Sequence, residues 1–112
     1  MATETATRAQ LALTTDAFAH ANNLAYTVPA ATVSTAVIVV SNVHATTSAN
    51  VDCVVDVLGA GTTFRYVAKN MAVPCGASIQ LSPITMLATD KLRIRASASS
   101  SLEAYASIIE VA

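Results

Sequence analysis

The sequence predicts an all-β protein, an antiparallel β-sandwich of about seven or eight strands with an extended N-terminal arm. From Leu24 onward, short runs rich in β-branched and aromatic residues are separated by turn residues at intervals of about ten. Helical periodicity is largely missing from these runs. Jelly-roll connectivity is one possible arrangement of these strands, but the spacing of the runs does not determine the strand order.

The beginning of the chain differs in composition, because it is rich in Ala and Thr. Residues 1–23 are expected to form an arm. Leu11, Leu13 and Phe18 are the positions at which this arm could contact another surface. Composition leaves two alternatives open, a disordered leader and a segment that lies across a neighbouring subunit. The β-sandwich domain is expected over residues 24–112.

The first two strands of the predicted sandwich differ in polarity. Leu24–Val28 ends at Pro29, whose missing N–H suits a strand end or a sheet edge. Thr35–Val43 is apolar at consecutive positions and therefore on both faces. One of these faces is expected to contact another subunit, because a half-exposed strand needs only one apolar face.

A hairpin is predicted next. In Val51–Leu58, Asp52 and Asp56 share the face that we expect to be solvated. The compact turn Gly59–Gly61 then leads into a strand over Thr62–Ala68.

Three further strands complete the predicted sandwich, over Ala77–Leu81, Lys91–Ala96 and Leu102–Val111. The last of these alternates until Ile108 and Ile109, which are both apolar. These consecutive isoleucines indicate either a β-bulge or an interface.

A basic stripe about 14 Å long is formed by Lys91, Arg93 and Arg95. Pairing with Asp52 and Asp56, or contact with another subunit, is favoured over a nucleic-acid role. The chain has six Lys and Arg against seven Asp and Glu, and its net charge of −1 gives no general attraction for phosphate backbones.

The composition contains an apolar surplus. Charged residues make up 12% of the chain, about half the usual share, whereas 54% is apolar. This surplus indicates a subunit that completes its burial against copies of itself, as a dimer or trimer, or against another protein. The longest apolar run, Ala36–Val40, is far short of the roughly 20 residues of a membrane span. No secretory signal is visible, so intracellular synthesis is expected.

No catalytic, cofactor-binding or metal-ligating residues are predicted, and the chain is not expected to be an enzyme. No spacing joins His20 or His44 to a nucleophile. Cys53 and Cys75 lack basic neighbours and are expected to be free, packed thiols. The ligand spacings of zinc sites are missing, and the few aromatic residues weaken the case for sugar recognition.

Two pairs of stretches carry a family resemblance. The first pair is Tyr26-Thr-Val-Pro-Ala-Ala and Ala36-Val-Ile-Val-Val-Ser-Asn42; the second is Leu87-Ala-Thr-Asp-Lys-Leu-Arg-Ile-Arg-Ala-Ser97 and Tyr105 with Ile109-Glu110. In these stretches the chain resembles the small virion structural proteins of tailed bacteriophages. The resemblance covers residues 24–112, and the chain departs from the common pattern in its longer leader and its two cysteines.

This resemblance implies a β-sandwich that decorates the capsid and cements neighbouring major capsid protein subunits. A place in the neck, tail or baseplate is the alternative, and a module that binds a host glycan is a further one. The family has no catalytic residues to carry over. The implied location is the virion, after synthesis and assembly in the host cytoplasm.

Overall fold

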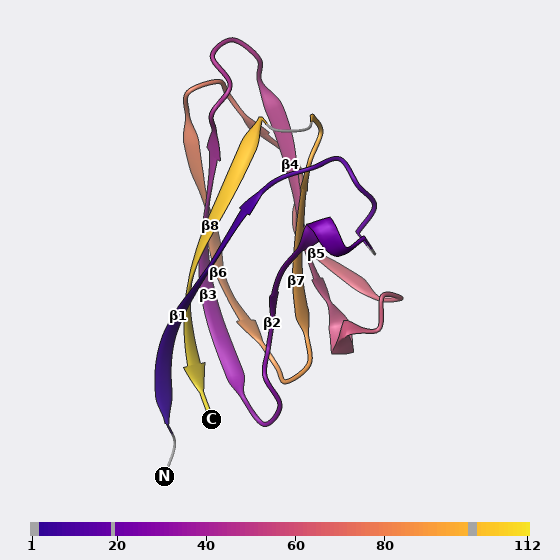
Figure 1. Cartoon of the computed structure of the whole chain (residues 1–112), viewed down its shortest axis with the longest axis vertical. Coiled ribbons are helices and arrows are strands. Elements are labelled where there is room, and N and C mark those ends of the chain that lie inside the picture. The colour runs from indigo at the N-terminus through magenta and orange to yellow at the C-terminus, as the bar shows by residue number, and fades with distance from the viewer. Residues whose placement is uncertain (1–2, 19, 99–100) are drawn as a thin grey trace.

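A computed structural model describes residues 3–18, 20–98 and 101–112, which form eight strands in two sheets (Figure 1). All strand pairings are antiparallel, so the predicted all-β sandwich is confirmed. The strands are β1 (Glu4–Ala12), β2 (Leu24–Thr27), β3 (Val33–Asn42), β4 (Ala49–Asp56), β5 (Phe64–Val73), β6 (Ser78–Met86), β7 (Lys91–Ala96) and β8 (Leu102–Val111). Two short 3-10 helices are η1 (Ala21–Asn23) and η2 (Val57–Gly59).

The strand order is that of a jelly roll. The first sheet has the order β1-β8-β3-β6 and the second has the order β2-β7-β4-β5. The pairs β1·β8, β2·β7, β3·β6 and β4·β5 join strands that lie equally far from the middle of the strand sequence, as in a rolled-up hairpin. The connectivity that the sequence left open is therefore settled.

Two strands are longer than the sequence predicted. The strand expected over Thr62–Ala68 is β5 and reaches Val73, and the one expected over Ala77–Leu81 is β6 and reaches Met86. Pro83 suggested a strand end, but it lies inside β6. β6 is an edge strand, where a residue without an N–H can be accommodated.

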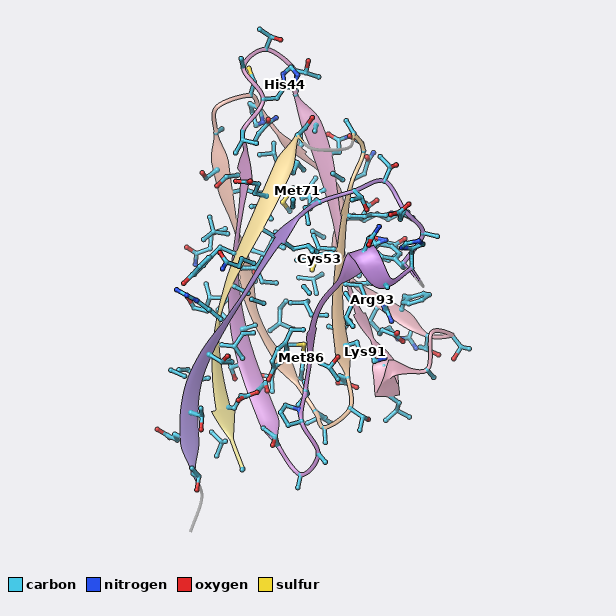
Figure 2. The ribbon with its side chains drawn as sticks, in the orientation of Figure 1. His44, Cys53, Met71, Met86, Lys91 and Arg93 are labelled. Carbon is cyan, nitrogen blue, oxygen red and sulfur yellow. The ribbon has the colours of Figure 1, made fainter. Side chains whose placement is uncertain are left out.

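The core lies between the two sheets. Alternate residues of the regular strands point inward, so that Ile38 and Val40 of β3 are fully buried. Cys53 of β4 lies between the layers, beside the interior side chains that Figure 2 shows. Burial raises the pKa of the Cys53 thiol to about 12, so this cysteine is the packed thiol that the sequence predicted. Cys75 is free but exposed, and the prediction that it is packed is wrong.

β8 is regular at its consecutive isoleucines. Its register with both β1 and β3 is unbroken, which excludes a bulge. Ile108 is buried in the core and Ile109 is exposed on the outer face of the sheet. Ile109 therefore adds an apolar side chain to the protein surface.

The extended N-terminal arm is a wrong prediction. Residues 4–12 form β1, which pairs with β8 from Glu4↔Val111 to Ala12↔Glu103. Leu13 is fully buried, and the chain then crosses from the first sheet to the second before β2 begins (Figure 1). Ala and Thr are small and compatible with a strand, so composition did not separate an edge strand from a leader. Residues 1, 2 and 19 of the predicted arm lie outside the described residues.

Candidate binding surface

Part of the outer face of the second sheet is covered by the chain itself. The cover segment, defined as residues 13–18 and 20–23, places the ring of Phe18 against that sheet, where Phe18 is 7% exposed. The guanidinium of Arg95 lies 4.2 Å from the ring centroid of Phe18, an attractive cation–π distance. The rings of Phe64 and Tyr66 lie 5.7 and 6.1 Å from it. The segment for which composition left open a disordered leader or a contact with a neighbouring subunit thus packs on its own domain.

Two ion pairs lie on this face. Arg93 donates to Asp56 over 3.0 Å, and Arg95 donates to Asp52 over 3.1 Å. Asp56 is fully buried, so the prediction that it is solvated is wrong. Its other carboxylate oxygen accepts from the backbone of Gly61, which satisfies it further. The predicted pairing with the two aspartates is confirmed for Arg93 and Arg95 of the basic stripe, and these four charges are neutralised within the sheet.

Local hydrogen bonds hold the cover segment. Asp16 accepts from the Thr14 hydroxyl and from the Asn22 amide, each over 3.0 Å. These hydrogen bonds, that from Asn22 first, lower the pKa of Asp16 from its usual value. The Asn23 amide donates to the carbonyls of Asp16 and Ala17. The segment is therefore a folded part of the domain.

The outer face of the first sheet has a different character. Outward positions of β3 and β8 carry large apolar side chains, and we call this surface the open face: Val33, Val37, Val39, Tyr105, Ile109 and Val111. Tyr105 is 43% exposed, Ile109 48% and Val39 36%. Within the described residues, no segment packs over these side chains as the cover segment packs over the second sheet. A sandwich that functions alone would be expected to present mainly polar residues there.

Tyr105 is the centre of the open face. A depression of about 350 Å³ lies on one side of it and borders Gln10, Val39 and Glu103. A second depression, of about 490 Å³, lies on the other side and borders Arg8 and Ile109. Both are open to solvent, and an aromatic side chain between two hollows is suited to interlock with a complementary surface.

The edge of the open face is polar. Gln10 of β1 lies opposite Tyr105, and Tyr105 in turn lies opposite Val39. Gln80 of β6 faces Val39 from the other side, so a row across the sheet runs polar, apolar, apolar, polar. An apolar centre with a polar rim is typical of protein–protein interfaces. The alternation in Leu102–Val111 already indicates this apolar surface, because it places Tyr105 and Ile109 on the face of the strand that points away from the core.

The histidines have local structural roles. His20 accepts from the backbone N–H of Asn22 at the start of η1, and its side chain lies 3.7 Å from Asp16. His44 is in the loop after β3, at one end of the molecule (Figure 2), and accepts from the backbone N–H groups of Thr46 and Thr47. Over the described ranges, no group of three or more His, Cys, Asp or Glu could hold a metal ion. The same part of the chain contains no helix with the length and apolarity to cross a membrane.

One contact joins residues from two stretches quoted for the phage resemblance. The hydroxyl of Tyr26 in β2 donates to the Glu110 carboxylate in β8. It also shares a hydrogen bond of 2.8 Å with Ser34 in β3. The contact connects the edge of the second sheet with the first sheet, and sequence reasoning did not find it because the two residues are far apart in the chain.

Comparisons of the chain with family models, with curated proteins and with solved structures give no match.

Proposed function

We propose that this chain is a virion structural protein of a tailed bacteriophage, a capsid decoration or cement protein that binds the major capsid protein through its open face. The observation that carries the proposal is the contrast between the two outer sheet faces. One is partly covered by the chain's own residues, with Phe18 packed against it, whereas the other exposes Tyr105, Ile109 and Val39. An exposed apolar surface with a polar rim is the usual sign of a partner.

The proposed mechanism is stabilisation by mass action. A protein that binds only the assembled shell favours that shell, by an amount that grows with its concentration relative to its dissociation constant. Many equivalent sites on one shell multiply this effect. Jelly rolls occur in viral capsids, lectins and cupins, so the fold accommodates this role without selecting it.

The proposal is tested by binding to capsids. Shells of the phage that carries this chain, assembled without it, are mixed with purified protein and sedimented. Tyr105→Asp should weaken binding about tenfold or more, because it places a charge at the centre of the contact. Leu58→Asp is the matched control, since Leu58 is 69% exposed but belongs to η2, next to the second sheet.

The outcomes separate the alternatives. Binding that is lost with Tyr105→Asp and retained with Leu58→Asp supports the proposal. Equal binding by both variants, or no binding of the unaltered chain to shells, contradicts it. Copy number in the virion locates the protein: hundreds of copies agree with a capsid position, whereas a few tens would move it to the neck, tail or baseplate.

A further inference from the structure

The free edge of β1 is the least protected sheet edge in the described structure. β6 contains Pro83 and has a register shift against β3. β5 has two register shifts against β4 and carries Lys69, and β2 is only four residues long. Prolines, bulges, lysines and short length are the usual means of preventing edge-to-edge pairing. β1 is nine residues long, contains no Pro, Gly or Lys, and keeps an unbroken register.

The hydrogen-bonding groups of β1 alternate in direction. Thr3 exchanges two backbone hydrogen bonds with Ala112, and the N–H of Leu13 donates to Leu102. In an antiparallel ladder, such pairs recur at every second residue, so the odd-numbered residues of β1 bond to β8. The backbone groups of Glu4, Ala6 and Arg8 therefore point away from the sheet. They present donors and acceptors at the spacing that another antiparallel strand needs.

The charges on β1 select one register for a second copy. When two copies pair about a two-fold axis at Ala6, Glu4 of each copy lies directly opposite Arg8 of the other. An axis at Glu4 or at Arg8 places like charges opposite each other, which is destabilising. An axis at Thr5 or Thr7 places neither charge opposite a charged residue. The register centred on Ala6 is thus the one that combines aligned backbone groups with opposite charges.

We propose that two copies of this chain form a dimer through antiparallel pairing of their β1 strands, centred on Ala6. Glu4, Ala6 and Arg8 of the two copies exchange about six backbone hydrogen bonds, two for each pair. Glu4 and Arg8 make two symmetric cross-strand ion pairs on the outer side. In the described structure, neither residue forms an ion pair within its own chain.

This dimer has a consequence for the open face. The two-fold axis is perpendicular to the sheet, so the two first sheets become one continuous sheet with both open faces on the same side. A bivalent surface of this kind binds a repetitive partner more tightly than either face alone. The pairing itself does not depend on the phage role, and it is tested on the purified protein alone.

The test is sedimentation velocity over a concentration series. The unaltered chain should shift from its monomer mass of 11.5 kDa to twice that mass. Glu4→Arg and Arg8→Glu should each raise the dimer dissociation constant about tenfold or more, because each places like charges in both symmetric pairs. The double variant with both changes restores opposite charges and should return the constant to within about threefold of the original.

Two further variants make the test independent of charge alone. Ala6→Pro removes an N–H that points away from β8, so it should abolish the dimer while leaving the fold intact by circular dichroism. Lys69→Glu on β5 makes the same change in net charge as Arg8→Glu and should leave the dimer unchanged. A chain that stays monomeric at millimolar concentration overturns the proposal. A dimer that survives Ala6→Pro, or that is not rescued by the charge exchange, also overturns it.

Discussion

The Tyr26 hydroxyl donates a hydrogen bond to the Glu110 carboxylate and thereby connects the edge of one sheet with the other sheet. Ser34, which is fully buried, takes part through its own hydrogen bond to the same hydroxyl. Burial, followed by the contact with Glu110, raises the pKa of Tyr26 to about 12. A neutral phenol is therefore the form that holds the two layers together at this margin.

Removing this hydroxyl should cost stability. We expect Tyr26→Phe to lower the free energy of unfolding by about 1 to 3 kcal/mol, because Glu110 loses a donor and the buried Ser34 hydroxyl loses its partner. Urea unfolding measures the effect. Tyr66→Phe is the control, since Tyr66 is 47% exposed, and it should change stability by less than about 0.5 kcal/mol. Equal effects of the two changes would show that the contact with Glu110 contributes nothing.

High pH should unfold the protein through two groups. The pKa of Cys53 rises from 9.0 to about 12 on folding, and that of Tyr26 from 10.0 to about 12. A raised pKa means that the folded state retains the proton more strongly, so stability is fully present below pH 9 and is lost as the pH rises towards 12. The measurement is the midpoint of urea unfolding at intervals of pH. Cys53→Ala, although less stable at neutral pH, should lose stability less steeply in this range, whereas an equally steep loss would contradict the assignment to the thiol.

The two ion pairs of the second sheet should contribute different amounts to the free energy of unfolding. Asp56→Asn leaves the buried Arg93 without its counter-charge, and we expect a loss of about 3 to 5 kcal/mol. Asp52→Asn, the matched change, affects a pair that is partly exposed to water and should cost less than about 1 kcal/mol. Chemical denaturation of both variants measures the difference. Similar losses from both changes would contradict the burial of Asp56.

The cover segment should contribute to stability. Phe18→Ala removes the ring that packs on Arg95, Phe64 and Tyr66, and we expect a loss of about 3 kcal/mol. Leu58→Ala, at a largely exposed position, should change stability by less than about 0.5 kcal/mol. Thermal unfolding distinguishes them. A Phe18→Ala variant as stable as the unaltered chain would mean that the segment does not pack on the second sheet in solution.

The sequence predicted those parts of the fold that depend on alternation. Strict alternation located β7 and the inward residues of β8. It also placed Asp52 and Asp56 on one face of one strand and the basic residues on one face of another, which predicted the pairing of Arg93 and Arg95 with the aspartates. It failed for β1, because Thr and Ala suit an exposed edge strand and a flexible leader equally well. It also failed for Asp56, which is buried where it pairs with Arg93 of a neighbouring strand and accepts a hydrogen bond from the Gly61 backbone, contacts that alternation along one strand does not contain.

Only part of the open face could be predicted from the sequence. The consecutive apolar residues of Thr35–Val43 correctly indicated a second apolar face on that strand. The position of Tyr105 between Gln10 and Val39 depends on strand order, which local patterns do not contain. The same is true of Tyr26 and Glu110, which meet only because the fold brings β2, an edge strand of the second sheet, near β8 of the first sheet.

Chemical modification of tyrosines on assembled particles tests most directly whether the open face is the contact surface. Tyr105 on the open face and Tyr66 on the second sheet are similarly exposed in the isolated chain, at 43% and 47%, so tetranitromethane should nitrate both when the protein is free. On purified virions, mass spectrometry should find Tyr105 protected and Tyr66 still nitrated. Nitration of Tyr105 on the particle to the same extent as Tyr66 would contradict the assignment of the open face as the binding surface.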